Sequence, residues 1–528
     1  MESERQPAKS AGKSSKACIQ PITGLSGRSP AAARRMPPMS GTAQRGPSPA
    51  VKSRHRSRLL GVAVLAGLLA GCARYHAEPL SPSASADALL SRTLEDPRLH
   101  KFIVHEMPED EDGTAGASQW GLAKLTLAAL YYHPDLAIAR SQLATAEARV
   151  ITAGQHPNPS LGFDELAFAP GTAAASPWII APIVNVLIET AGKRQYRTAE
   201  AKNLVDAARR DVATAAWGVR GRVRTAMLSL WASRQRLALT RQSLARQEQL
   251  LDLYQRRLTA GETSARTVTR ERITRNRLLL DIEEAKARRE QAKSALARAI
   301  AVPMRGLAGI RLSFAAFDRP GSPNLEGEIG RLRRGALLGR SDLQSRLADY
   351  AAAQSALQLE IAHQYPDVTL SPGYIFDPGA NAYLLLPAVD LPIFNQNQGP
   401  IAEAQARRRE AAARFTALQA GIIAEIDSAY AGYQGKLRSL ATADVLLAEA
   451  ERRDRQVSHS FAAGEVDRPT LVAGKLELAA ARLSHLDAVI GERRALGSLE
   501  DALQHPLFEP DAGFLVPDGE GRPAAPLS

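Results

Sequence analysis

Apolar positions recur at helical spacing along a long stretch of this chain. No proline interrupts residues 195–258, and five leucines there lie seven residues apart: Leu230, Leu237, Leu244, Leu251 and Leu258. A seven-residue repeat of leucine is typical of a coiled-coil seam. At 1.5 Å per residue, these roughly 60 residues predict a helix about 90 Å long, which is far longer than a helix of a globular domain.

The helical pattern occurs twice. Residues 199–201 and residues 402–404 both read Ala-Glu-Ala, and residues 260–262 and 463–465 both read Ala-Gly-Glu, at the same offset of 203. Each Ala-Gly-Glu segment interrupts the pattern, and a further helix is expected after each. The last of these has apolar positions that alternate by four and three: Val472, Leu476, Ala479, Leu483, Leu486 and Ile490. The chain is therefore an internal duplication built on long helices.

A strand-like pair of segments precedes each long helix. Their sequences, read as strands of about 10 residues, lie at about 158–188 and 366–392: "PSLGFDELAF", "WIIAPIVNVLI", "PDVTLSPGYIF" and "NAYLLLPAVDLPIF". About ten residues is the length of a transmembrane β-strand. Four such strands cannot close a barrel, but three copies supply twelve. Asn185 and Asp390 interrupt the apolar segments and are predicted to face the barrel lumen, the alternative being strand-end positions in the interface.

These patterns predict a mainly α chain with a small β part, organised as tandem helix–strand pair–long helix hairpin repeats. The expected divisions are a leader at 1–71, a lipid-anchored linker at 72–118, a first repeat at 119–302, an equatorial connector at 303–340, a second repeat at 341–505 and a disordered tail at 506–528. A first helix is expected from about residue 119, interrupted at "HPD" (residues 133–135) and resuming to about residue 154, and a short one at about 324–338.

Charge is concentrated at the N-terminus. The formal net charge is +12, but residues 1–71 hold twelve Lys or Arg and two acidic residues. The rest is close to neutral, which argues against a nucleic-acid partner. The basic segment "KSRHRSR" and the apolar run Leu59–Ala70 have the form of a signal peptide. Translation from Met1, Met36 or Met39 is compatible with this signal.

The residues "LAGC", ending at Cys72, resemble the lipobox of bacterial lipoproteins. That resemblance implies that Cys72 becomes the acylated first residue of the mature chain; the alternative is an ordinary signal peptide with a chance cysteine. Ala73 rather than aspartate follows it, which in lipoproteins implies sorting to the outer membrane. The other cysteine, Cys18, lies in the leader, so no disulfide is expected in the mature chain.

Over about residues 119–505 the chain resembles the TolC-type outer-membrane efflux factors. The resemblance rests on the duplication, "HPNPSL", the two "AGE" turns, "ALGSLEDAL", and the segments "TAGKRQYRTAEA" and "LPIFNQNQGPIAEA", which look closest to the heavy-metal, cobalt–zinc–cadmium-type branch. It implies a homotrimer with a 12-stranded outer-membrane β-barrel continued by an α-helical periplasmic tunnel. It also implies a periplasmic adaptor and, indirectly, an inner-membrane efflux pump as partners.

Within this resemblance the two turns become candidate adaptor-docking sites at the periplasmic mouth: Leu258, Gly261, Glu262, Phe461, Gly464 and Glu465. In drug-efflux relatives, Tyr and Asp side chains close the mouth; the matching positions here are Phe461, Thr267, Thr470 and Ala473, which cannot form those bonds. Asp467 and Glu465 are candidates for a substitute acidic ring, the alternative being solvated turn charges.

No catalytic constellation, cofactor motif or metal-ligand motif is present. "AGKR" lacks the spacing and the hydroxyl residue of a P-loop, and the histidines lack the HExxH spacing. We therefore expect no enzymatic activity and no cofactor. The predicted function is a passive efflux conduit; the alternative is a periplasmic coiled-coil adaptor or scaffold lipoprotein without a pore. The resemblance to the heavy-metal branch suggests heavy-metal ions as cargo, whereas the residues themselves do not identify the exported substrate.

Overall fold

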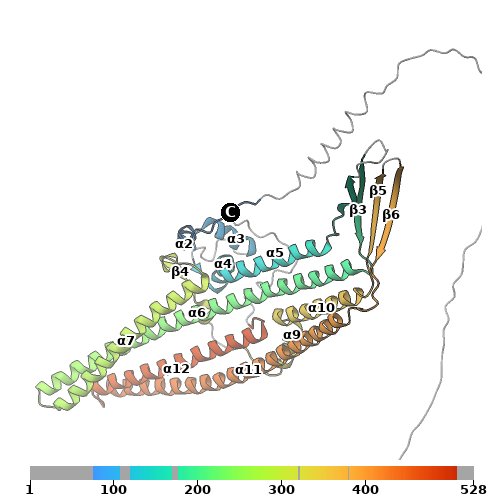
Figure 1. Cartoon of the computed structure of the whole chain (residues 1–528). Coiled ribbons are helices and arrows are strands. Elements are labelled where there is room, and N and C mark those ends of the chain that lie inside the picture. Colours follow the sequence, from blue (N-terminus) through green and yellow to red (C-terminus); the bar gives the residue numbers. More distant parts are fainter. Residues whose placement is uncertain (1–74, 108–118, 169–176, 319–321, 378–379, 508–528) are drawn as a thin grey trace, which may run out of the picture. The chain divides into compact units, whose positions relative to one another are not determined.

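The computed structural model describes residues 75–107, 119–168, 177–318, 322–377 and 380–507 (Figure 1). The predicted leader at 1–71, Cys72 and the part of the predicted tail beyond residue 507 lie outside these ranges. Backbone contacts divide the chain between Pro79 and Leu80, and every described helix and strand belongs to the unit that begins at Leu80. The description below concerns that unit.

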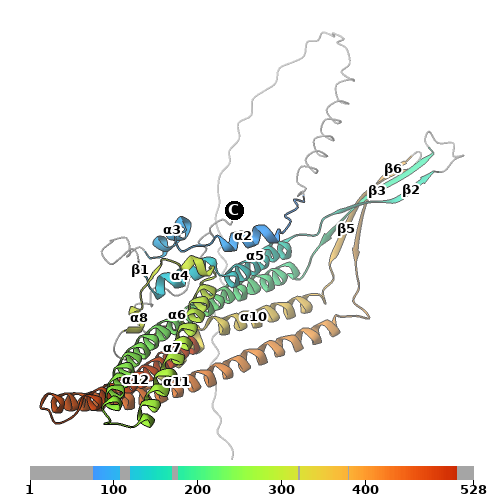
Figure 2. The same ribbon diagram turned by 90° about the vertical axis from the view of Figure 1, so that its left-hand side faces the viewer.

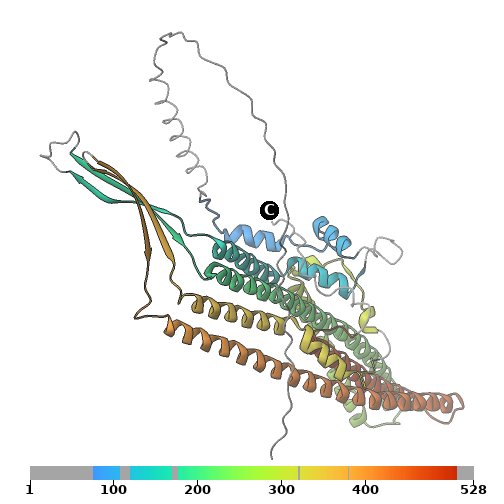
Figure 3. The same ribbon diagram turned by 90° about the vertical axis from the view of Figure 1, so that its right-hand side faces the viewer.

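Four long helices form two antiparallel hairpins, one in each repeat (Figures 1, 2 and 3). Helix α6 (Lys193–Thr259, 67 residues) is followed by α7 (Ala265–Ile300), and α11 (Gln398–Ala462, 65 residues) by α12 (Arg468–Leu503). At 1.5 Å per residue, α6 is about 100 Å long. Among the described residues, no helix combines the length and the apolar character that crossing a bilayer requires.

The leucine repeat of α6 faces its neighbours only in part. Leu230, Leu237 and Leu251 are buried, whereas Leu258 at the end of the helix is exposed. Helix α6 packs against α7, α10, α5 and α12 along its length, and α12 packs against α11. These tertiary contacts stabilise α6 over a length that its intrinsic helix propensity alone would not hold.

Shorter helices extend each hairpin towards the sheet. In the first repeat these are α4 (Leu122–Tyr132) and α5 (Pro134–Gly154); in the second, α9 (Ile329–Gly339) and α10 (Ser341–Ala362). The interruption expected at "HPD" lies at His133, whose ring nitrogen caps α5 by accepting from the Asp135 N–H. Pro134 at the first helical position favours this start.

The strands of both repeats join in one antiparallel sheet. Strands β2 (Ser160–Phe168), β3 (Trp178–Ile188), β5 (Val368–Asp377) and β6 (Ala380–Val389) lie in the order β2-β3-β5-β6. The pairing of β3 with β5, for example Val186 with Leu370, connects the two halves. Strands β2 and β6 are the edges, so each leaves one row of backbone groups without a partner strand in the described sheet.

The segment at 72–118 was expected to be a linker, but its described part is largely helical. It contains α2 (Pro82–Leu90) and α3 (Pro97–Glu106), capped by the side chains of Ser81 and Asp96. Leu99 and Ile103 of α3 are buried in the largest apolar cluster. The Ser, Pro and Asp residues that suggested a loop are in fact helix-starting residues.

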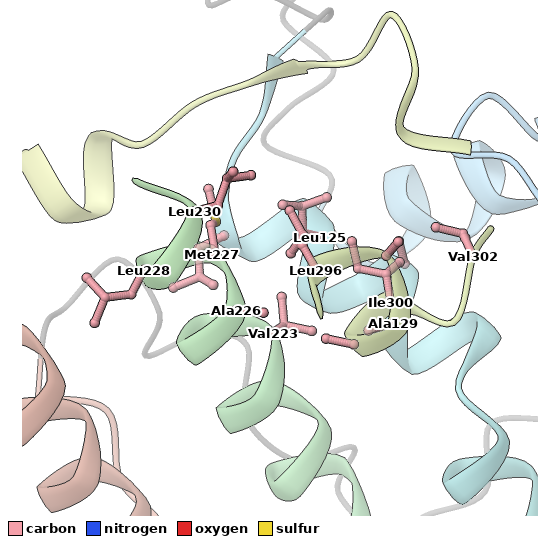
Figure 4. Packing of buried hydrophobic residues seen from close by; sticks show 14 of the residues in the cluster. Leu125, Ala129, Val223, Ala226, Met227, Leu228, Leu230, Leu296, Ile300 and Val302 are labelled. Carbon is pink, nitrogen blue, oxygen red and sulfur yellow. The ribbon is translucent and has the colours of Figure 1, made fainter. Parts of the chain in front are cut away.

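That apolar cluster holds the first repeat together at the level of α4. Its labelled members come from α4, α6, α7 and the segment just after α7 (Figure 4): Leu125, Ala129, Val223, Ala226, Met227, Leu228, Leu230, Leu296, Ile300 and Val302. Around it, β1 (Gln119–Trp120) pairs in parallel with β4 (Arg311–Leu312) of the connector, which also contains the 3-10 turn η2 (Met304–Leu307) and α8 (Ala315–Asp318). Part of the connector expected at 303–340 therefore packs around this apolar cluster.

Candidate functional site: the hairpin turns and the strand face

The two Ala-Gly-Glu segments form turns with the same hydrogen-bonding pattern. Gly261 and Gly464 have φ values of 77° and 78°. The Glu262 N–H donates to the Arg257 carbonyl at 2.7 Å, and the Glu465 N–H donates to the Ser460 carbonyl at 2.8 Å. This is the Schellman pattern, in which a residue in the left-handed region ends the helix. Glycine is favoured at that place because a Cβ is strained by about 1–2 kcal/mol at such φ values.

The helices after the turns start with equivalent caps. The Thr267 N–H donates to Ser264 Oγ at 3.3 Å, and the Thr470 N–H donates to Asp467 Oδ1 at 2.9 Å. Thr267 and Thr470, which were predicted to line the mouth, thus lie in the first turns of α7 and α12. Hydrogen bonds from Thr470 and the neighbouring Arg257 guanidinium hold the pKa of Asp467 below its usual value.

An ion pair links the two turns. Arg257 Nη1 at the end of α6 lies 2.8 Å from Asp467 Oδ2 at the start of α12, and Arg257 Nε lies 3.4 Å from Glu262. The pair is exposed, so its contribution to stability is about 0–1 kcal/mol. It nevertheless places both turns at the same end of the hairpins. Because Asp467 is paired within its own chain, an acidic ring would depend mainly on Glu465, and it stays a prediction.

Exposed apolar side chains accompany both turns. Leu258 is 36% exposed and Phe461 is 38% exposed, and each lies three residues before its turn glycine. The six residues predicted to dock an adaptor therefore lie together at the tip of the paired hairpins. Their docking role stays a prediction.

A polar row crosses the sheet. Asn185 of β3 accepts from Ser371 Oγ of β5 at 2.7 Å, and its amide nitrogen donates to Ser160 Oγ of β2 at 3.3 Å. The sequence singled out Asn185 but missed both serines, whose small side chains carry no pattern of their own. Asp390 lies one residue beyond β6 and is exposed, which is the strand-end position given as its alternative. Which face of the sheet meets a lumen stays a prediction.

The strands are fastened to the long helices by residues of "TAGKRQYR". Lys193, which is 5% exposed, donates from Nζ to the Tyr365 carbonyl and to Asp367 Oδ1, both at 2.7 Å. The Thr190 N–H donates to the same carboxylate oxygen at 2.8 Å. Gly192 between them has a φ of 74°. This motif therefore joins the start of α6 in the first repeat to the start of β5 in the second.

Within the described ranges, no three His, Cys, Asp or Glu residues are grouped as a metal ion requires. What the arrangement offers is a strand face, a helical body and a pair of exposed turns.

Residues 126–302 match the family model of outer membrane efflux proteins. The chain is 26% identical over 270 residues to the cobalt-zinc-cadmium resistance protein CzcC of Cupriavidus metallidurans, which covers 50% of this chain and 61% of that protein. It is 26% identical over 263 residues to the outer membrane protein OprJ of Pseudomonas aeruginosa, covering 46% and 48%. The chain thus spans about half to three fifths of these relatives.

Solved structures share the fold. The outer membrane protein VceC of Vibrio cholerae superposes with a TM-score of 0.59 at 18% identity, covering 73% of this chain and 96% of that one. The outer-membrane channel OprN superposes with a TM-score of 0.59 at 16% identity, covering 82% and 98%, and CusC with 0.57 at 16%, covering 73% and 92%. Residues 126–302 are thus similar to the outer membrane efflux protein family, and the solved structures share the fold of the chain.

Proposed function

We propose that this protein is the outer-membrane channel of a tripartite efflux system and passively conducts substrate that an inner-membrane pump exports through a periplasmic adaptor. One observation carries the proposal. A four-stranded sheet with two unpaired edges lies at one end of the α6 helix, and the two turns linked by an ion pair lie at the other end, about 100 Å away.

The sheet supports a trimer. Exposed apolar side chains occupy β2, β3 and β6, among them Leu161, Phe163, Val184 and Leu385. Exposed sheet edges are costly in a lipid environment because each unsatisfied backbone group costs several kcal/mol. Three copies joined edge to edge make a closed barrel of twelve strands, and the polar row at Asn185 then suits a water-filled interior.

Anchorage and location follow from the N-terminal residues. Acyl chains on Cys72 would hold the chain at the outer membrane, while the hairpins extend into the periplasm. The turn residues Leu258, Gly261, Glu262, Phe461, Gly464 and Glu465 are the proposed contact with the adaptor. The inner-membrane pump is an indirect partner.

Heavy-metal ions are the proposed cargo class, because the relative CzcC is named for cobalt, zinc and cadmium resistance. The family fold alone does not set the cargo, since function resides in sites and not in folds. In a passive conduit, the choice of substrate lies with the pump.

Bilayer recording of the purified full-length protein tests the proposal. A channel gives discrete conductance steps from a particle with the mass of three chains, and its electrophoretic mobility changes on heating. A chain that stays monomeric and gives no conductance would support the pore-free adaptor or scaffold alternative. Loss of metal resistance on gene deletion, restored by the intact gene, would test the cargo class.

A further inference from the structure

Arginines of α6 meet acids of α12 along the line where these two helices pack in antiparallel fashion. The pairs are Arg224–Glu500 (3.1 Å), Arg236–Asp487 and Arg257–Asp467 (2.8 Å). As residue numbers rise along α6, they fall in matching steps along α12. The pairs therefore mark one continuous register, which we call the α6–α12 seam.

At one position of the α6–α12 seam, the arginine of α6 has no acidic residue of α12 opposite it. Between Arg236 and Arg257, the register brings Arg246 opposite Leu478, and both border a hollow of about 330 Å³. The charged residues of α12 that border this hollow are Lys475 and Arg482, which are cations like Arg246, whereas the neighbouring Glu477 is paired with Arg453 of α11 at 3.1 Å. An arginine that elsewhere on the seam would face a carboxylate here faces two positive charges.

The hollow retains a surplus of positive charge. Arg246 donates to the neutral Gln249 at 3.3 Å, and Arg482 lies 4.0 Å from Glu451, at the limit of an ion pair. One carboxylate, Asp454 of α11, borders the hollow, and its Oδ1 is buried without a hydrogen-bond partner among the described residues. Three cations around one carboxylate favour the entry of another negative group.

The residues that line the hollow leave room for a side chain from a third helix. The small residues Ala245 and Ala479 border the hollow on α6 and α12. Small residues in a groove between two helices let the ridge of a third helix approach closely. Arg246 lies eleven residues before Arg257, so about 17 Å of helix separate the hollow from the turns. A hairpin that contacts the turns has only to extend a few helical turns to reach it.

Charge around the tip differs between the two hairpins. Residues 241–280, from α6 through the first turn into α7, contain nine arginines and four acidic residues, whereas residues 444–483 of the second hairpin contain six Lys or Arg and seven acidic residues. The excess of positive charge therefore lies on the first hairpin, where it raises the association rate of an acidic partner.

We propose that the hollow at Arg246, Lys475 and Arg482 receives a carboxylate side chain from a helix of the periplasmic adaptor. The inference rests on the proposed function and adds a second contact, of stated charge, above the turns. The incoming carboxylate completes the α6–α12 seam at the one position where α12 supplies no acid.

A photo-reactive residue tests this contact in the full-length protein. Benzoylphenylalanine in place of Ala479, in cells that produce the lipidated chain, should cross-link a periplasmic protein through a helical peptide that contains Asp or Glu. Lys475→Glu together with Arg482→Glu should lower the yield at least tenfold, and Lys475→Gln with Arg482→Gln should lower it less. Arg438→Glu, an exposed charge reversal elsewhere on α11, is the matched control and should leave the yield unchanged.

Charge exchange makes the test specific. Replacing the cross-linked acid of the partner by lysine should restore the adduct with the Lys475→Glu, Arg482→Glu chain. An unchanged yield in the double variant, or no restoration, overturns the inference. So does a variant whose only change is a different anion preference in planar bilayers, because the cations would then serve permeating anions.

Failure of the inference is separable from failure of the proposed function. Conductance of the purified trimer is recorded for the same variants. If the trimer conducts but cross-links form only from positions beside Gly261 and Gly464, the channel function is supported and the docking role of the hollow is rejected. Absence of conductance rejects the channel itself and the inference that rests on it.

Discussion

Lys193 at the start of α6 and Asp367 just before β5 form an ion pair with Nζ–Oδ1 at 2.7 Å, across 174 residues of sequence. The lysine is almost fully buried, and its ammonium group also donates to the Tyr365 carbonyl. The contact joins the first repeat to the second where helices give way to strands. One substitution that breaks this contact should therefore destabilise the junction between the two repeats.

Lys193→Met should lower the melting temperature of the protein. Removing one partner leaves the other charge partly buried, which costs about 3–5 kcal/mol for a fully buried pair. We expect less, about 2 kcal/mol, because the Asp367 side chain is 26% exposed. Thermal melting followed by circular dichroism measures the effect. Lys202→Met, an exposed lysine on the same helix, is the control; equal melting of the two variants would contradict the assignment.

The long elements were predictable because their signals are local. A seven-residue leucine repeat and the absence of proline identify α6, and two short segments of β-branched and aromatic residues identify β2 and β3. The Ala-Gly-Glu turns were predictable for the same reason, since left-handed glycines after a helix leave a compositional mark.

Contacts between distant segments were not predictable. The packing of α3 against α4 depends on only a few apolar residues, including Leu99 and Ile103, which in a sequence of Ser, Pro and Asp resemble a loop. The pairing of Arg257 with Asp467 joins residues 210 apart, and no local pattern relates them. Such contacts are decided by tertiary packing, which overrides local propensity.

Glu492 gives a pH-dependent prediction. Its side chain is fully buried in α12, and burial raises its pKa although Arg493 at 3.4 Å opposes the shift. A carboxyl group whose pKa is higher in the folded state binds its proton more tightly there than in the unfolded state. Stability from this group is therefore full below the unfolded value, near 4.5, and is lost as pH rises through the folded value.

Glu492→Gln should accordingly raise the melting temperature at pH 7 and flatten its dependence on pH above about 4.5. Melting at several pH values, in buffers of equal ionic strength, measures both effects. The exposed Glu403→Gln of α11 should change neither. A destabilised Glu492→Gln protein at pH 7 would show that the Arg493 contact outweighs the cost of burial.

Lipidation at Cys72 gives a prediction outside the described residues. Cys72→Ala should leave a chain that no longer incorporates labelled fatty acid and no longer fractionates with the outer membrane, because each buried CH₂ contributes about 0.8 kcal/mol to anchorage. Metabolic labelling with palmitate measures the first effect, and membrane fractionation measures the second. Cys18→Ala is the control. Label that persists on the Cys72→Ala chain would place the acyl group elsewhere.

The turn glycines allow docking to be separated from folding. An added Cβ at Gly261 or Gly464 meets no atom within 4 Å, so the first atom of a new side chain has open space around it in its own chain. The remaining cost is the strain of a side chain at a φ near 77°, about 1–2 kcal/mol per turn. That cost is confined to an exposed turn about 100 Å of helix away from the sheet.

Gly261→Trp combined with Gly464→Trp should therefore abolish efflux while the trimer and its conductance persist. The measurements are trimer level at the cell surface, resistance to the exported substrate and cross-linking to the adaptor. Gly330→Trp, in α9, is the control, because that glycine also meets no atom within 4 Å and has no positive φ. Loss of the trimer would make the turns part of the structural core. Unchanged resistance with both tryptophans present would show that the adaptor contacts the hairpins elsewhere, and the docking role of Leu258, Phe461 and the two glycines would be rejected.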